Sequence, residues 1–221
     1  MKLIIFDMDG LMFDTEAIGF RAYEEVGKEW GLSTSFDIYE TLIGVDKRDT
    51  CERYRQLYGA DMDAELFYRQ VGDRIQEIMD REGIPMKPGL LPLLDAIEEA
   101  DIPKIIASST GQDGIRSYLK RCGLDERFKD TISSDQVKRG KPHPDIFLAA
   151  CRKMGTEPEE ALVLEDSPAG ICAAHSGNIP VIAIPDLKEI PEEIREMCVM
   201  VGETLEDVIP FVKANRNIGE R

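Results

Sequence analysis

Two aspartates lie two positions apart, directly after a short apolar run near the start of the chain. Asp7 and Asp9 follow the apolar residues 3–6 and precede Gly10. In an extended segment, side chains at positions i and i+2 project in similar directions, so both carboxylates could contact one ion. On its own, the pattern Asp-x-Asp-Gly also fits a polar turn at the end of a strand. Other polar clusters must decide between these interpretations.

Three such clusters follow later in the chain. Ser108 and Ser109 begin a Ser-Ser-Thr-Gly segment at the start of a predicted helix, where hydroxyl and backbone N–H groups suit an anion. Lys141, in Gly-Lys-Pro, offers a cation just before another predicted helix. Glu165 and Asp166 end an apolar run with two more carboxylates. Each cluster alone fits a helix cap or a solvated charge, but together and in this order they indicate one site.

Phosphoryl transfer is the chemistry that these groups could perform together. Crowded carboxylates repel one another unless a divalent cation lies among them, and oxygen ligands that leave room for water and phosphate favour Mg²⁺. The cation and Lys141 would neutralise a phosphoryl group whose oxygens the Ser108 hydroxyl holds. One aspartate would attack phosphorus in line to form an aspartyl-phosphate, while a second would protonate the leaving oxygen and later deprotonate the incoming one.

Short apolar runs that alternate with helical patterns predict the fold that positions these groups. Continuous apolar runs are typical of parallel strands that are buried on both faces. Strands alternating with helices predict an α/β fold, a parallel sheet with helices on both faces. Strands are expected at residues 3–6, 104–107, 130–133, 161–164 and 180–184, with a weaker one at 198–201. Helices are expected at residues 111–121, 144–154, 167–176, 191–197 and 204–214.

The segment between the first two expected strands is far longer than one crossover requires. It spans about ninety residues. From residue 15 to about 82 it shows helical periodicity, and residues 85–89 fit a linker. We therefore expect a helical cap domain over residues 15–85, inserted into a catalytic core of residues 1–14 and 86–221. An insert that leaves after the first strand starts at the strand's carboxyl end, where open α/β sheets bind ligands.

Composition limits the partners and the compartment. The chain has 221 residues and a net charge of −16, which argues against a nucleic-acid or anionic-membrane partner. A bound cation would still allow a small anionic substrate. The five cysteines are scattered and odd in number, which favours free thiols in a reducing cytosol. No run approaches the ~18 apolar residues of a membrane helix, and the start does not fit a secretory signal. We expect a cytoplasmic monomer.

The four motifs, in this order, resemble those of the haloacid dehalogenase superfamily. Residues 6–16, FDMDGLMFDTE, are similar to its first motif, and the DTE ending resembles the β-phosphoglucomutase-like subfamily. Ser108, Lys141 in GKPHPDIF, and Glu165 with Asp166 in LEDSPAGI match the other motifs. The resemblance covers nearly the whole chain and implies a Rossmann-like core with a helical cap.

The resemblance also implies residue roles. Asp7 would be the nucleophile and Asp9 the general acid and base, while Ser108, with Ser109 beside it, and Lys141 would bind phosphate. Mg²⁺ would be held by Asp7, the Asp9 carbonyl and Asp166, with Glu165 as a ligand or a group beside the ligands. An acid/base Asp9 favours phosphate esters, because relatives that cleave carbon–halogen or carbon–phosphorus bonds lack it.

A phosphatase of a small phosphorylated metabolite, such as a sugar phosphate, fits best. The alternative is a sugar phosphomutase, but these carry a His four residues after the Thr of the DTE motif, where this chain has Gly19. They also carry an Arg after a Gly-Val pair, and here Gly44-Val45 precedes Lys47 and Arg48 with imperfect spacing. A phospho-acceptor switch without turnover fits less well, because its acceptor Asp follows a later strand. Lys47 and Arg48 are candidates for holding the distal end of the substrate, with a solvated loop as the alternative.

Overall fold

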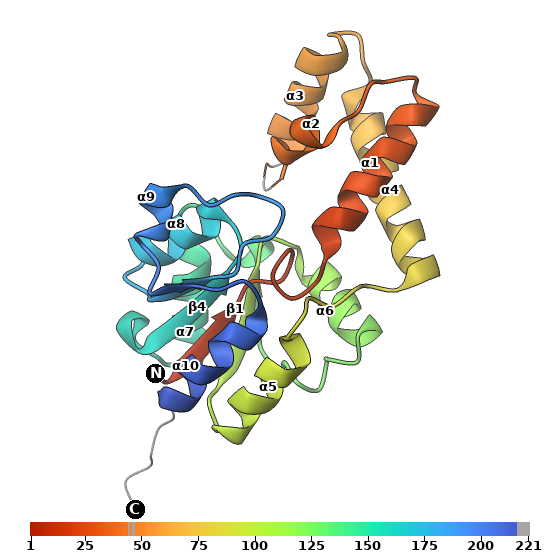
Figure 1. Cartoon of the computed structure of the whole chain (residues 1–221). Helices are drawn as coiled ribbons and strands as arrows, with labels where there is room; N and C mark the ends of the chain where they lie inside the picture. Colours follow the sequence, from red (N-terminus) through yellow and green to blue (C-terminus); the bar gives the residue numbers. More distant parts are fainter. Residues whose placement is uncertain (44, 46, 216–221) are drawn as a thin grey trace, which may run out of the picture. The chain divides into compact units, whose positions relative to one another are not determined.

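The computed structural model describes residues 1–43, 45 and 47–215, which form two compact units (Figure 1). The core unit comprises Met1–Asp14 and the chain from Pro85 onward, and the helical unit comprises Thr15–Ile84. Two backbone hydrogen bonds join the segments where the chain leaves and re-enters the core unit. Asp14 N donates to Pro85 O, and Lys87 N donates to Met12 O, both at 2.9 Å.

The core unit is built on a six-stranded sheet with the strand order β3-β2-β1-β4-β5-β6. Every neighbouring pair of strands is parallel. The strands are β1 (Leu3–Phe6), β2 (Lys104–Ser108), β3 (Thr131–Ser133), β4 (Ala161–Glu165), β5 (Val181–Ala183) and β6 (Met200–Val201). The structure thus confirms the predicted α/β fold with a parallel Rossmann-like sheet, and the expected strand limits need only small adjustments.

Helices cover the sheet on both faces. Leu3 and Ile5 of β1 pack in one buried cluster with Phe147 of α7 and Ile171 of α8. Because side chains alternate along a strand, Ile4 and its alternate neighbours face the other side. The helices are α5 (Leu90–Glu99), α6 (Gln112–Arg121), α7 (Asp145–Met154), α8 (Pro168–Ser176), α9 (Glu192–Arg195) and α10 (Val208–Ala214), with 3₁₀ turns η1 (Ser134–Gln136), η2 (Pro158–Glu160) and η3 (Leu205–Asp207).

The sequence pattern did not predict α5. Its sequence, LLPLLDAIEE, contains Pro92 among apolar residues, which argues against a helix interior. Pro92 falls in the first turn, however, where its missing N–H needs no acceptor within the helix. Leu90, Leu93 and Leu94 are buried, and α5 lies beside α10 (Figure 1). Tertiary burial therefore decides that this segment is helical.

The helical unit contains α1 (Thr15–Glu29), α2 (Phe36–Glu40), α3 (Lys47–Tyr58) and α4 (Ala64–Glu82). α1 packs against α4, with Phe67 completely buried between aromatic neighbours. At the surface, Arg74 of α4 donates to Glu25 and Glu29 of α1, each at 2.8 Å. These contacts hold the two long helices together within the unit.

The cysteines and the hydropathy of the helices bear on the expectations from composition. All five cysteines lie among the described residues, and none of them forms a disulfide. Burial raises the pKa of the Cys151 thiol to about 11, which keeps it protonated and unreactive at neutral pH. In the part of the chain that the structure describes, no helix has the length and apolar character that crossing a bilayer requires.

Candidate active site

Three central strands end side by side, and each is followed by one of the polar clusters. β2, β1 and β4 are neighbours in parallel register, with Phe6 opposite both Ile106 and Leu164. Because parallel strands present their carboxyl ends at the same edge, the residues that follow them lie close together. Asp7 N donates to Leu164 O at 3.0 Å, which ties the first cluster to β4.

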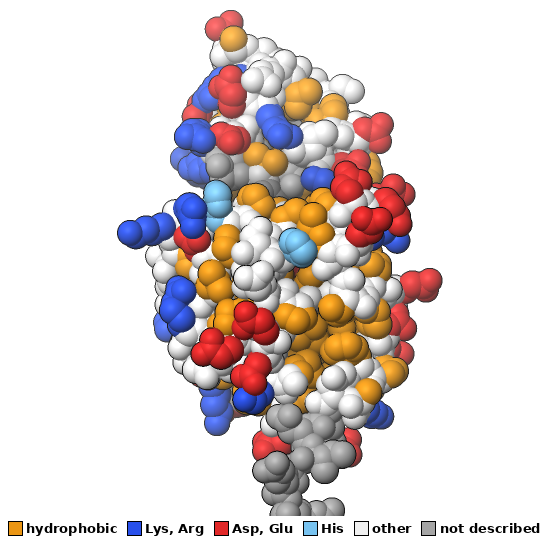
Figure 2. Space-filling view, turned by 90° about the vertical axis from the view of Figure 1, so that its left-hand side faces the viewer, with side chains coloured by type: hydrophobic (Ala, Val, Ile, Leu, Met, Phe, Trp, Pro, Cys, Tyr) orange, Lys and Arg blue, Asp and Glu red, His pale blue; other side chains and the backbone are white. Residues whose placement is uncertain are grey.

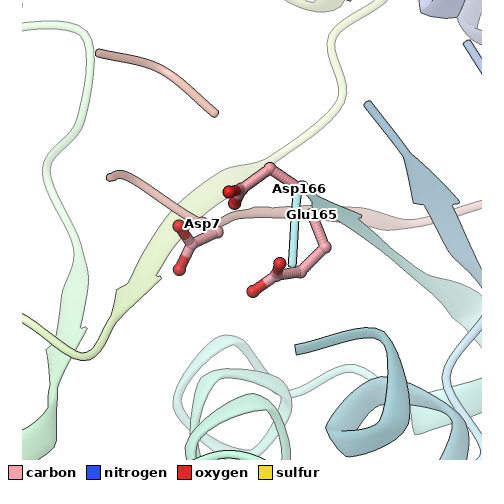
Figure 3. Close-up of side chains that lie close together, drawn as sticks. All are labelled: Asp7, Glu165 and Asp166. Atoms are coloured by element: carbon pink, nitrogen blue, oxygen red, sulfur yellow. The ribbon is translucent and has the colours of Figure 1, made fainter. Parts of the chain in front are cut away.

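Three buried carboxylates form the centre of this edge. Oxygen atoms of Asp7, Glu165 and Asp166 all lie within 4.8 Å of one another, around one space at the ends of β1 and β4 (Figure 3). Glu165 is completely buried, and the other two are nearly so. Carboxylates are costly to bury unless positive charge compensates them. A nearby positive charge would therefore stabilise the ionised cluster.

Lys141 supplies one positive charge. Its ammonium contacts Asp7 Oδ1 and Glu165 Oε1, and only 8% of its side chain is exposed. The same nitrogen lies 4.9 Å from the centre of the Phe147 ring, which packs beneath it. One ammonium faces three carboxylates, so this group of side chains keeps an excess of negative charge when all of them are ionised.

Burial and the excess negative charge shift the pKa values of the cluster. Burial, together with the nearby charge of Glu165, raises the pKa of Asp7 to about 7 although Lys141 opposes the rise. Burial and the charges of Glu165 and Asp7 raise the pKa of Asp166 well above its usual range. Burial acts to lower the pKa of Lys141, but its two carboxylate partners outweigh this and raise it. The site therefore favours binding another cation, and its oxygen-only donor set suits Mg²⁺.

The three carboxylates differ in how much of their hydrogen-bonding capacity is used. Glu165 Oε1 contacts Lys141, and Glu165 Oε2 accepts from Ser167 N at 2.7 Å and Ser167 Oγ at 2.9 Å. Asp7 uses Oδ1 for Lys141. Among the described residues, no hydrogen bond reaches the Asp166 carboxylate. Asp166 and the second oxygen of Asp7 are thus the donors most available to a cation, and Glu165 orients Lys141.

Asp9 belongs to a second cluster beside the first. Its Oδ2 accepts from Thr110 Oγ1 at 2.6 Å and from Ser108 Oγ at 3.3 Å, and Thr110 N donates to Ser108 Oγ at 3.0 Å. These bonds hold the Asp9 side chain toward the segment that follows β2. Ser109, by contrast, is exposed. The site therefore includes Thr110, which the sequence analysis placed in the motif without giving it a role.

Asp186 is a second residue that the sequence analysis missed. It follows β5, the neighbour of β4, and its side chain is 7% exposed. Its Oδ1 contacts the ammonium of Lys87. Its charge also contributes to the raised pKa of Asp166. Asp186 belongs to the site because β5 lies beside β4. A single sequence does not reveal this strand order, so it gave no signal for the residue.

The two cap candidates both lie at the start of α3 in the helical unit. Lys47 Nζ lies 5.7 Å from the centre of the Tyr68 ring. Arg48 has 86% of its side chain exposed and contacts its neighbour Asp49 at 3.0 Å. Within their own unit, neither side chain is buried in a polar site.

Gly19 on α1 occupies the position where mutases of the resembled subfamily carry a His. A Cβ at Gly19 would overlap the Tyr39 hydroxyl, which donates to Glu16 Oε2 at 3.0 Å. The space beside Gly19 is therefore filled by another side chain. Two residues of the loop with the Gly-Val pair, Gly44 and Asp46, lie outside the described residues.

Comparisons with known proteins show the family to which the chain belongs. The family model of haloacid dehalogenase-like hydrolases matches residues 4–184. A phosphorylated carbohydrates phosphatase of Thermotoga maritima is 31% identical over 179 residues, covering 81% of this chain and 82% of the relative. A probable pseudouridine-5′-phosphatase of Drosophila melanogaster is 34% identical over 190 residues, covering 82% and 80%. The crystal structure of a candidate β-phosphoglucomutase from Thermotoga maritima has a TM-score of 0.81 at 28% identity, covering 97% of this chain and 100% of the other.

Proposed function

Since this chain belongs to the haloacid dehalogenase-like hydrolases, in their β-phosphoglucomutase-like branch, and is a phosphoric monoester hydrolase, we propose that it is a Mg²⁺-dependent phosphatase of a small phosphorylated carbohydrate. The reaction would pass through an aspartyl-phosphate on Asp7. The observation that carries this proposal is the buried trio of Asp7, Glu165 and Asp166 with one ammonium, from Lys141, at the ends of β1 and β4.

The chain's own residues account for the steps. Asp7 attacks phosphorus with its carboxylate, and Lys141, already in contact with Asp7, neutralises the phosphoryl oxygens. Asp9 protonates the leaving oxygen of the sugar and then takes a proton from the attacking water. Ser108 and Thr110 hold Asp9 through its Oδ2. We also propose that the Ser108 hydroxyl donates to a phosphoryl oxygen, as the family resemblance implies.

Asp7, Asp166 and the Asp9 carbonyl would hold Mg²⁺, with Glu165 beside them. When bound, the ion supplies positive charge that stabilises the phosphoryl group and the crowded carboxylates. The raised pKa values of Asp7 and Asp166 support such a role, because burial and the neighbouring carboxylates disfavour the ionised forms, which a bound cation would stabilise.

Gly19 supports the phosphatase over the mutase. A mutase-type His cannot take this position without displacing Tyr39, whose hydroxyl fills the space. The structural likeness to a candidate β-phosphoglucomutase keeps the mutase as the alternative. Transfer of the phosphate between two positions of one sugar and its release to water give different products, so product analysis separates the two.

The test is phosphate release from a panel of hexose, pentose and hexitol phosphates and nucleoside 5′-monophosphates, each with MgCl₂ and with EDTA. We expect release from sugar phosphates that EDTA abolishes. Equal release in EDTA would contradict the role of the metal. Absence of release from every compound, with an isomerised sugar phosphate visible by ³¹P NMR after adding a sugar bisphosphate, would establish the mutase instead.

Lys47 and Arg48 are proposed to hold the distal polar end of the substrate. The proposal rests on their charge and their exposure in the helical unit. We expect Lys47→Ala or Arg48→Ala to lower kcat/KM for the best substrate by about tenfold, mainly through KM. Lys28→Ala, which removes an exposed cation from α1, is the matched control. If neither substitution differs from this control, the two residues have no part in substrate binding.

The proposed compartment and partners rest on composition. We propose a cytoplasmic monomer that binds a small phosphorylated substrate and no nucleic acid or membrane. A net charge of −16 supports this, as do five free thiols. On the face shown in Figure 2, basic side chains stand in small groups with acidic ones among them.

A further inference from the structure

Asp186 has one carboxylate oxygen that is buried without a hydrogen-bond partner. Its Oδ1 contacts Lys87, but its Oδ2 has no partner in the described part of the chain. The side chain is 93% buried, with 7% exposed. An ionised oxygen that is buried without a donor costs free energy, so a native structure normally supplies one.

The unpartnered oxygen faces the carboxylate cluster. A Cβ placed on Gly10 would overlap Asp166 Oδ2 and would lie 3.3 Å from Asp186 Oδ2, so both oxygens point at the same spot. Gly10 itself follows the Asp7–Asp9 motif and has φ of +83°, a conformation that other residues avoid. The close approach of two carboxylate oxygens leaves no room for a side chain there.

Strand order explains how Asp186 reaches this place. β5 pairs with β4 in parallel register, with Ala183 opposite Glu165. The loop after β5 therefore emerges beside Asp166. Lys87 fixes the other oxygen of Asp186, so the carboxylate cannot turn away without losing an ion pair whose partners are largely buried.

We propose that Asp186 is a positioning residue for the metal, which accepts through Oδ2 a hydrogen bond from a water molecule bound to Mg²⁺. This inference rests on the proposed function, because it requires Mg²⁺ at Asp7 and Asp166. Mg²⁺ keeps several of its waters in protein sites, and these waters need acceptors. Mutation of a group that hydrogen-bonds to a metal ligand without touching the metal typically lowers metal affinity by about 10- to 100-fold. Asp186 also lies just beyond residue 184, where the family match ends.

The alternative role is that Asp186 serves only to hold Lys87. Lys87 lies where the chain re-enters the core unit, and its ammonium is 3.9 Å from Asp14 as well. If that were its whole role, removal of either partner of the Lys87–Asp186 pair would have the same effect on the protein. Removal of Lys87 and of Asp186 would have different effects on metal binding if Asp186 faces the ion.

The experiment measures Mg²⁺ binding directly, without substrate. The 221-residue chain is titrated with MgCl₂ at pH 7.5. The midpoint, which is the Mg²⁺ concentration that half-saturates the protein, is taken from isothermal titration calorimetry and from the Mg²⁺-dependent rise in Tm. The variants are Asp186→Asn, which keeps the shape of the side chain, and Lys87→Met. Glu189→Gln, which removes an exposed carboxylate from the same loop, is the matched control.

We expect Asp186→Asn to raise the Mg²⁺ midpoint at least about tenfold. Lys87→Met keeps the Asp186 carboxylate but removes the contact that orients it, so it should raise the midpoint less than Asp186→Asn does, and Glu189→Gln should match the wild type. Equal midpoints for Asp186→Asn and the wild type would overturn the inference, as would parallel losses in Asp186→Asn and Lys87→Met. Absence of any Mg²⁺ response in the wild type would overturn the metal dependence of the proposed function as well.

Discussion

The ammonium of Lys141 contacts the carboxylate of Asp7, although 134 residues separate them in the sequence. The same nitrogen contacts Glu165, so one lysine joins the residue that follows β1 to the last residue of β4. This places a positive charge directly on the proposed nucleophile. A phosphoryl group bound at Asp7 would meet that charge at once, which is the electrostatic support that phosphoryl transfer requires.

Asp7→Asn should abolish turnover. The amide cannot attack phosphorus, so we expect phosphate release to fall by about a thousandfold or more. Stability should change less than activity, because the substitution also removes one of three crowded carboxylates. The measurements are phosphate release and Tm, and Asp113→Asn on the exposed start of α6 is the control. Substantial activity in Asp7→Asn would refute its role as nucleophile.

Thr110→Val should slow the reaction through Asp9. The Thr110 hydroxyl makes the shorter of the two hydrogen bonds to Asp9 Oδ2, at 2.6 Å, and Val keeps the shape without the donor. We expect kcat to fall about tenfold with little change in KM, a loss that belongs to the acid/base step. Thr110→Ser, which keeps a hydroxyl, should recover most of the rate. A loss in Thr110→Ser as large as in Thr110→Val would show that packing, rather than the hydrogen bond, matters.

The stabilisation of the protein by Mg²⁺ should grow with pH. The pKa of Asp7 is raised to about 7 and that of Asp166 is raised as well, whereas an Asp in the unfolded chain has a pKa of ≈ 3.9. The metal-free folded protein therefore holds more protons than the unfolded chain between about pH 4 and 7. The contribution of these two groups to the free energy of unfolding is therefore fully present below pH 4 and is lost as the pH rises through 7.

Mg²⁺ competes with these protons, so its binding releases them and is weak in acid. We expect the rise in Tm with saturating MgCl₂ to be small at pH 5 and largest at pH 8. Thermal denaturation across this range, with MgCl₂ or with EDTA, measures the rise. A rise that stays constant with pH would contradict the raised pKa values.

Gly19 and Tyr39 should show strong coupling in stability. Gly19→Ala normally favours a helix by roughly 0.5–1 kcal/mol, but here its Cβ would overlap the Tyr39 hydroxyl and disturb the bond to Glu16. We therefore expect Gly19→Ala to lower the free energy of unfolding in the wild type. In a Tyr39→Phe background the hydroxyl is absent, and the same substitution should raise it. A double-mutant cycle by chemical denaturation gives the coupling, and additive effects would contradict the observed packing.

The sequence by itself determined the motifs and the elements that carry them. Residues 3–6 form a strand whose two faces are both covered, and a continuous apolar run in the sequence is enough to predict such a strand. Asp7, Asp9, Lys141, Glu165 and Asp166 could be named because each lies at a strand or helix boundary that the local pattern marks. Family membership followed from the same residues in the same order.

Only the tertiary structure decided which distant groups meet. The helix α5, which the sequence analysis did not predict, is buried beside α10 although it contains Pro92. The role of Thr110 and the presence of Asp186 in the site could not be predicted locally, because their partners Asp9 and Lys87 lie about a hundred residues away in the chain. The order of the strands, with β5 beside β4, brings Asp186 to the carboxylate cluster. Long-range contacts of this kind depend on the assembled sheet, so no local pattern of residues specifies them.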